Sequence, residues 1–155
     1  MDITLLVFYA VLALGISFIC SILEAVVLSV PHTYIAVLQK EGKKSGNIWS
    51  QLKDDDAVKP LTSILTLNTI AHTMGAAGVG SQVQSVWGEE YLTVASIILT
   101  IAVLFFSEIV PKTLGTAYWK QLAPITGIFL TYLVKILMVI IIPIQMLKSI
   151  LPKGS

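Results

Sequence analysis

An unbroken apolar run at residues 3–30, ITLLVFYAVLALGISFICSILEAVVLSV, constrains the fold of this chain more than any other feature. Glu24 is its one charged residue, and the run exceeds the roughly 20 apolar residues that a membrane-spanning helix needs. No basic residues precede it and it lacks a persuasive cleavage site, so we interpret it as a retained transmembrane helix and not as a signal peptide. Because a backbone in lipid must make its hydrogen bonds internally, the run predicts an all-α membrane protein.

The composition favours a lipid solvent for the rest of the chain as well. Hydrophobic residues make up 55% of the 155 residues and charged residues 12%, about half the charged fraction of a soluble domain. We predict two further spans at about residues 61–86 and 92–119, hence three transmembrane helices. A net charge of +1 gives no broad basic surface for nucleic acid. The single cysteine, Cys20, excludes an intrachain disulfide.

The segment between the first two predicted spans, residues 32–58, is polar and has apolar residues at helical spacing. Gly42 and Gly46 are expected to divide it into two short amphipathic helices at the membrane surface. The whole loop between the first two predicted spans, residues 31–60, carries five lysines, whereas the short turn before the third span carries none. The positive-inside rule then places the N-terminus outside and this loop in the cytoplasm.

The last apolar stretch, residues 122–151, admits two interpretations. Its length suffices for a fourth span, but Pro124, Lys135, Pro143 and Lys148 interrupt it. After three spans the chain is again in the cytoplasm, and the lysines near its end favour keeping it there. We therefore favour a bent, amphipathic juxtamembrane helix and a cytoplasmic C-terminus, in a multi-pass protein of the cell (plasma) membrane.

Two carboxylates, Glu24 and Glu108, lie inside the predicted spans. A charge at the bilayer centre costs about 2.5–3.5 kcal/mol on insertion scales, so each carboxylate needs a partner or a function. One interpretation is structural: an ion pair between Glu108 and Lys112, one turn later, or a protonated carboxyl that bonds between helices. The other is an ion or proton site. Ser17 and Ser21 share a helix face with Glu24, and this alignment favours the second interpretation.

The predicted span at 61–86 is the least apolar of the three and is rich in polar side chains. Such a helix is buried among other helices or lines a polar cavity. Asn68 is its strongest candidate ligand, because an amide oxygen is a hard neutral donor, whereas His72 on the same face is expected to pack or to form a hydrogen bond. Gly75 and Gly78 allow close helix packing or expose carbonyls to an ion, and they lie in a candidate pivot.

The stretch FFSEIVPKTLG, residues 105–115, places a helix breaker just after an acid in an apolar environment. Pro111 lacks an N–H, so the carbonyl of Ser107 loses its helical partner and needs another one in lipid. That carbonyl, the Ser107 hydroxyl and the Glu108 carboxylate offer three oxygen donors at one predicted kink. A plain proline bend repaired by Ser107 explains the same pattern. Oxygen donors without sulfur or clustered imidazole suit hard cations such as Mg²⁺, Ca²⁺, Mn²⁺ or Na⁺, and this chemistry does not separate Mg²⁺ from Na⁺.

Three ordered motifs carry a family resemblance that covers nearly the whole chain. SFICSILEAVVLSV, LTLNTIAHTMGAAG and FFSEIVPKTLG resemble the DUF21 transmembrane domain of the CorB/CorC and CNNM (cyclin M) magnesium transporters. The strongest match is to the family's S/G-E-x-x-P-K signature, here Ser107, Glu108, Pro111 and Lys112. The resemblance implies three transmembrane helices, a juxtamembrane amphipathic helix and a homodimer. It also implies a cytosolic CBS-pair module that binds ATP-Mg²⁺ in the full-length protein.

The resemblance further implies an intramembrane Mg²⁺ site. Carried over residue by residue, its ligands are Ser21, Asn68 and Glu108, together with Ser17 and Glu24. The family usually has two Asn or Asn-like residues in the second span, whereas here Asn68 is followed by Thr69.

We expect from these observations that the chain exports Mg²⁺ in exchange for Na⁺. A largely dehydrated ion would be held near the Pro111 kink, and helix rearrangement would give alternating access. Two rival functions are a Mg²⁺-sensing membrane scaffold without transport and a proton-coupled carrier of another substrate, with Glu24 and Glu108 as proton relays. An enzyme is not expected, because no catalytic motif is recognisable.

Overall fold

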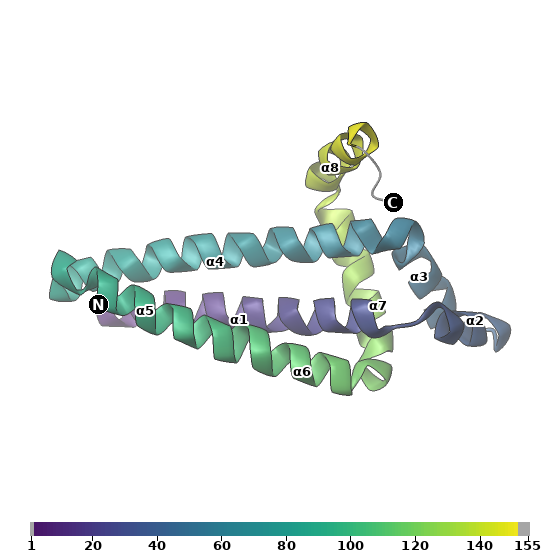
Figure 1. The fold of residues 1–155 in the computed structure, drawn as a ribbon, viewed down its shortest axis with the longest axis horizontal. Helices are drawn as coiled ribbons and strands as arrows, with labels where there is room; N and C mark the ends of the chain where they lie inside the picture. Colours follow the sequence, from purple (N-terminus) through teal and green to yellow (C-terminus); the bar gives the residue numbers. More distant parts are fainter. Residues whose placement is uncertain (1, 152–155) are drawn as a thin grey trace. The chain divides into compact units, whose positions relative to one another are not determined.

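The computed structural model describes residues 2–151, which are helical almost throughout and include no strand (Figure 1). The elements follow one another along the chain as α1 (Asp2–Ser29), α2 (His32–Lys40), α3 (Lys44–Leu52), η1 (Asp54–Ala57), α4 (Val58–Trp87), η2 (Glu89–Tyr91), α5 (Leu92–Ala102), η3 (Val103–Ile109), α6 (Val110–Ala117), α7 (Trp119–Ile136) and α8 (Met138–Ile150). Here η1 and η2 are 3₁₀ turns, and η3 is a π-helical segment. The all-α class predicted from the sequence is confirmed for this part of the chain.

The chain divides into two compact units. Unit 1 comprises the chain up to Ala25 together with Leu65–Ala117, and unit 2 comprises Val26–Ile64 and the chain from Tyr118 onward. The helices α1 and α4 each contribute residues to both units. Every residue that the sequence analysis proposes for the ion site or for a pivot belongs to unit 1.

Two helical stretches are long and apolar enough to cross a membrane, Ile3–Ser29 and Glu89–Ala117. The bent pair α7 and α8 passes the same criteria if it is counted as one span. The helix α4 covers the span predicted at 61–86, but Thr, Asn, His, Ser and Gln interrupt its apolar residues and it does not qualify by hydropathy. These helices support a multi-pass membrane protein, and the number of three spans and their orientation stay predictions.

Small residues bring α1 and α4 into close contact within unit 1. A Cβ atom added at Gly75 would overlap the Cβ of Ala13, and one added at Gly78 would lie 2.5 Å from the ring of Tyr9. Residue numbers rise along α1 while those of its contacts on α4 fall, so the two helices are antiparallel here (Figure 1). Close approach through glycine is how membrane helices gain packing contacts.

A third glycine brings α6 against α1, nearer the C-terminal end of α1. A Cβ atom at Gly115 would lie 2.7 Å from the Cβ of Ala25 and 2.9 Å from the carbonyl oxygen of Ile22. Ser107, earlier on its helix, contacts Ser21, which is earlier on α1. Residue numbers therefore rise together on the two helices, so α6 runs parallel to α1 and α1 contacts both α4 and α6.

The helical perturbation predicted near Pro111 takes the form of the π-helical segment η3. The N–H of Val110 donates to the carbonyl of Phe105, five residues back, instead of the usual four. The ring of a proline inside an α-helix clashes with the carbonyl four residues earlier, and a wider turn just ahead of it relieves that clash. The stretch Glu89–Ala117 consequently continues past Pro111 as one long helical stretch.

Two short helices, α2 and α3, form the surface segment predicted at 32–58, and both lie in unit 2. Gly42 separates them and has φ +74°, a conformation that glycine adopts at little cost. The prediction that Gly46 also breaks the segment is wrong, because Gly46 lies inside α3. A Cβ atom there would lie 2.6 Å from the backbone nitrogen of Gln39, so glycine is needed for the close approach of α2 and not for a turn.

Trp49 anchors α3 on α7 within unit 2. Its side chain is fully buried, and its indole Nε1 donates a hydrogen bond of 2.9 Å to the carbonyl of Ala123. A Cβ atom at Gly127 would lie 2.9 Å from the same nitrogen, so glycine one turn later makes room for the indole. A buried indole N–H normally needs such an acceptor.

The last helices, α7 and α8, meet at an angle of 83°, and this bend is compatible with a juxtamembrane helix and with a broken span, so the interpretation of residues 122–151 stays a prediction. The break falls at Leu137 and not at either proline. Pro124 and Pro143 lie inside α7 and α8, just beyond the first turn, so each removes one backbone hydrogen bond of its helix.

Lys53 caps the C-terminal end of α1. Its Nζ donates a hydrogen bond of 2.9 Å to the carbonyl of Val27 in the last turn of that helix, and α1 has no basic residue of its own there. A cation at this end of a helix is favourable because the last carbonyls carry partial negative charge. Burial lowers the pKa of Lys53 below its ordinary value.

Candidate ion site in unit 1

Ser107 bonds to α1 through both of its oxygens. Its carbonyl, which Pro111 leaves without a helical donor, accepts a hydrogen bond from the Ser21 hydroxyl. Its own hydroxyl donates to the carbonyl of Leu14 at 3.2 Å. Ser21 and Ser107 are both buried. Ser21 is therefore the partner of this carbonyl, for which the sequence predicted a need. The Ser107 hydroxyl bonds to a carbonyl of α1 and not to one in its own helix.

Lys112 contacts both carboxylates of the predicted spans. Its Nζ lies 2.8 Å from Oε2 of Glu108, one turn earlier on the same helical stretch, and 3.9 Å from Oε2 of Glu24 on α1. All three side chains are partly accessible, with exposed fractions of 43% for Lys112, 28% for Glu108 and 35% for Glu24. The sequence indicates the first contact by its spacing, whereas the second follows only from the parallel packing of α1 and α6.

Ser17 joins α1 to α4. Its Oγ lies 2.7 Å from Nε2 of His72, within hydrogen-bonding distance, and the serine is fully buried. His72 thus takes the hydrogen-bonding role that the sequence analysis favours for it. Ser17 and Ser21 stand one turn apart on α1, so the same helix face reaches α4 through the first serine and η3 through the second.

Asn68 carries a buried oxygen that lacks a partner. Its Oδ1 is inaccessible and accepts no hydrogen bond from the described part of the chain. The antiparallel contacts of α1 with α4 place His72 opposite Ser17. One further turn, forward on α1 and backward on α4, brings Asn68 opposite Ser21. Helical register therefore predicts that Asn68 lies near the Ser21–Ser107 contact.

The residues proposed as ligands thus fall into connected groups and not into one pre-formed cage. Direct contacts join Ser21 to Ser107, Glu24 and Glu108 to Lys112, and Ser17 to His72, and helical register adds Asn68. Among residues 2–151 no three His, Cys, Asp or Glu side chains gather as a metal cluster, so sites built on imidazole or thiolate are not indicated. Hydroxyl, amide, carbonyl and carboxylate oxygens suit a hard cation.

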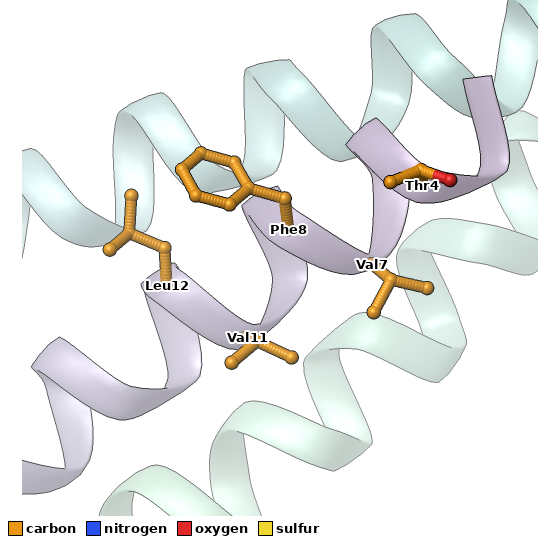
Figure 2. Close-up of a pocket in the computed structure, with 5 residues that line it drawn as sticks. All are labelled: Thr4, Val7, Phe8, Val11 and Leu12. Carbon is orange, nitrogen blue, oxygen red and sulfur yellow. The ribbon is translucent and has the colours of Figure 1, made fainter. Parts of the chain in front are cut away.

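Two surface hollows of unit 1 differ in chemistry. One, of about 340 Å³, is lined by Thr4, Val7, Phe8, Val11 and Leu12 of α1, and Figure 2 shows these mostly apolar side chains along the helix. Such a surface suits lipid tails better than an ion. The other hollow, of about 460 Å³, is open and lies along α6, lined by Lys112, Thr113, Thr116 and Ala117. Through this hollow, solvent can reach the Lys112 ammonium, which contacts both carboxylates.

Some participants in this region carry no signal in the sequence. The Leu14 carbonyl is a backbone group, so no residue type marks it as an acceptor. The contact between Glu24 and Lys112 requires the relative register of two helices that are far apart in the chain. A rare charged residue in an apolar helix is a usable signal, and it did lead the sequence analysis to Glu24, Glu108 and Lys112 separately.

Two comparisons with known proteins bear on this chain. Residues 8–153 match a family model described as the cyclin M transmembrane N-terminal domain. The chain is also 30% identical over 133 residues to UPF0053 protein sll1254 of Synechocystis sp., an alignment that covers 86% of this chain and 37% of that protein. The chain therefore spans well under half the length of this relative. On the strength of the match over nearly its whole length, the chain belongs to the cyclin M (CNNM) transmembrane N-terminal domain family.

Proposed function

We propose that this chain is the membrane domain of a Mg²⁺ transporter that exports Mg²⁺ in exchange for Na⁺ across the plasma membrane. In this proposal α1, α4 and the stretch from α5 to α6 cross the membrane, the N-terminus is outside, and α7 and α8 form a juxtamembrane helix at the cytoplasmic face. Family membership, the apolar helices and the lysine-rich loop after α1 support it.

The proposed protein is a homodimer whose remaining sequence includes a cytosolic CBS-pair module. The alignment covers 37% of the Synechocystis relative, so the rest of that relative is long enough to include such a module. Regulation by nucleotide is assigned to that part of the full-length protein and not to the residues described above.

The observation that carries the proposal is the buried, unpartnered Oδ1 of Asn68. Leaving a buried acceptor without a partner costs about 1–3 kcal/mol, so a folded protein rarely keeps one without a use for it. A cation between α1, α4 and η3 supplies the missing partner. Helical register supports a position of Asn68 near Ser21, whose hydroxyl bonds to the carbonyl of Ser107, the residue next to Glu108.

In the proposed site neutral oxygens set the geometry and carboxylates supply the charge. The ligands are Ser21, Asn68 and Glu108, with Ser17, Glu24 and Ser107 beside them. Mg²⁺ prefers six oxygens at about 2.0–2.1 Å and loses water reluctantly, so several protein oxygens must approach it together. Because Pro111 frees one backbone carbonyl in this region, the helix can offer an oxygen that an uninterrupted α-helix would keep for itself.

Transport by the full-length protein in liposomes tests the function. We expect movement of Mg²⁺ that depends on an opposing Na⁺ gradient and is lost in Asn68→Leu and Glu108→Gln, while Thr69→Val, an exposed neighbour on α4, transports as wild type. Mg²⁺ binding without any flux would favour a sensor or scaffold over a transporter. Flux that is indifferent to Na⁺ would remove the exchange mechanism, and unchanged Mg²⁺ affinity in both site variants would remove the ligand assignment.

A further inference from the structure

Lys112 places a positive charge at the carboxylates that the proposed site assigns to a metal ion. Residues 1–25 and 65–117 contain no other Lys or Arg. The ammonium lies 2.8 Å from Glu108 and 3.9 Å from Glu24, so it already neutralises part of their charge. A divalent cation arriving at Glu108 would meet this ammonium within a few ångströms, where solvent and salt screen the repulsion only weakly. Metal and ammonium therefore compete for the same oxygens.

The structure also gives the ammonium a place to move to. The side chain of Lys112 is 43% exposed and borders the open hollow of about 460 Å³ along α6. Thr113 and Thr116 line this hollow, and the Thr113 hydroxyl donates its proton to the Ile109 carbonyl at 2.7 Å. The oxygen of Thr113 therefore has lone pairs available to an ammonium. Four methylene groups with several staggered rotamers let the lysine head move without a change in the backbone.

We propose that Lys112 is a tethered counter-ion that alternates with the transported cation at Glu108 and Glu24. Without metal, the ammonium holds the two carboxylates, as it does in this structure. When a divalent cation binds, the ammonium moves into the hollow along α6, and when the cation leaves, the ammonium returns. The inference rests on the proposed function, because it requires Glu108 to be a ligand of the transported ion.

This role makes Lys112 a residue that promotes release of the ion, not a ligand. Two carboxylates held close together repel each other when no cation lies between them, so the returning ammonium stabilises the metal-free state. Stabilising that state weakens metal binding and speeds release. A purely structural ion pair between α6 and α1 has the opposite consequence: its removal would loosen the helices around the site and weaken metal binding.

Metal titrations of the full-length protein in lipid nanodiscs separate the two roles. The apparent affinity equals the intrinsic affinity multiplied by the fraction of protein in which the site is free. A competitor that occupies about 90% of sites therefore lowers the apparent affinity about tenfold. We expect Lys112→Met to bind Mg²⁺ roughly tenfold more tightly or better and to transport it more slowly in liposomes, and Lys112→Arg, which keeps the charge, to stay near wild type. Lys59→Met is the control, since Lys59 is exposed and belongs to unit 2.

Two results would overturn the inference, and they are distinguishable. If wild type binds and transports Mg²⁺ but Lys112→Met binds no more tightly, the tethered counter-ion is wrong and the proposed function stands. If wild type neither binds nor transports Mg²⁺, the proposed function fails and the inference fails with it.

Chemical labelling of the wild-type protein gives a test that needs no variant at the site. Acetylation of lysines by a small amine-reactive ester, read peptide by peptide by mass spectrometry, reports how free each ammonium is. We expect Mg²⁺ to raise the labelling rate of Lys112 severalfold while that of Lys59 stays constant. An unchanged or lower rate at Lys112, at Mg²⁺ concentrations that saturate binding, would show that the ammonium does not leave the carboxylates.

Discussion

Replacing Asn68 by leucine separates a metal ligand from a structural residue, because the two roles predict opposite changes in stability. In the metal-free protein the substitution removes a buried oxygen that has no hydrogen-bond partner, and it keeps a side chain of similar volume. Relief of an unsatisfied buried acceptor is worth about 1–3 kcal/mol. We therefore expect the free energy of unfolding to rise by about that amount in Asn68→Leu when a chelator is present.

Saturating Mg²⁺ should reverse which of the two proteins, wild type or Asn68→Leu, has the larger free energy of unfolding. A ligand that binds only the folded state stabilises it by about 4.1 kcal/mol at a concentration of 1,000 times Kd. Wild type gains this stabilisation and the leucine variant forfeits it. The variant is thus expected to be the more stable protein without Mg²⁺ and the less stable one with it.

Thermal unfolding of the full-length protein in detergent, followed by tryptophan fluorescence without nucleotide, measures both differences. One kcal/mol corresponds to about 2–4 °C in Tm for a domain of this size, so the crossing should be resolved. Thr69→Val is the matched control, because this exposed neighbour on α4 should change neither Tm nor the response to Mg²⁺. A leucine variant that melts below wild type in chelator, or that keeps the full Mg²⁺ response, would refute the reasoning.

Two further predictions concern single hydrogen bonds to backbone carbonyls. Ser21→Ala should destabilise the metal-free protein by about 1–3 kcal/mol, because the buried Ser107 carbonyl loses its hydrogen-bond donor. Pro111→Ala restores a backbone N–H, so in that background the same substitution should cost less stability in a double-mutant cycle measured by thermal unfolding. Equal losses of stability in both backgrounds would contradict the explanation. Trp49→Phe should lower stability by about 1–3 kcal/mol because the Ala123 carbonyl loses its indole donor, and a Tm equal to that of wild type would show that the bond contributes nothing.

Where the sequence contains a residue with one strong physical preference, the fold could be predicted. Gly42 adopts the positive φ that few other residues tolerate. Glu24 and Glu108 were identifiable as candidates because a charge in an apolar helix is costly without a role, and Asn68 was a candidate because its amide oxygen is a hard neutral donor.

Features that depend on the register between packed helices, or on hydrogen bonds to backbone carbonyls, could not be predicted from the sequence. Gly46 was expected in a turn, since the packing of α2 that demands it cannot be known before the two helices are paired. The bond from Lys53 to the Val27 carbonyl joins a side chain to a group that every residue possesses. The π-helical form of η3 likewise depends on how the chain before Pro111 packs, and spacing alone indicated only that some perturbation was needed there.

The hydroxyl protons of Ser21 and Ser107 both go to backbone carbonyls, those of Ser107 and Leu14. A serine hydroxyl has one proton and two lone pairs, so each of these oxygens has nothing further to donate and only electron pairs to offer. Donating a hydrogen bond also polarises the oxygen and makes it a better acceptor. An anion would find no donor at these two side chains, whereas a cation would find acceptors that need not reorient. By accepting these two hydrogen bonds, the backbone carbonyls make this part of the site favour a cation over an anion, independently of the two carboxylates.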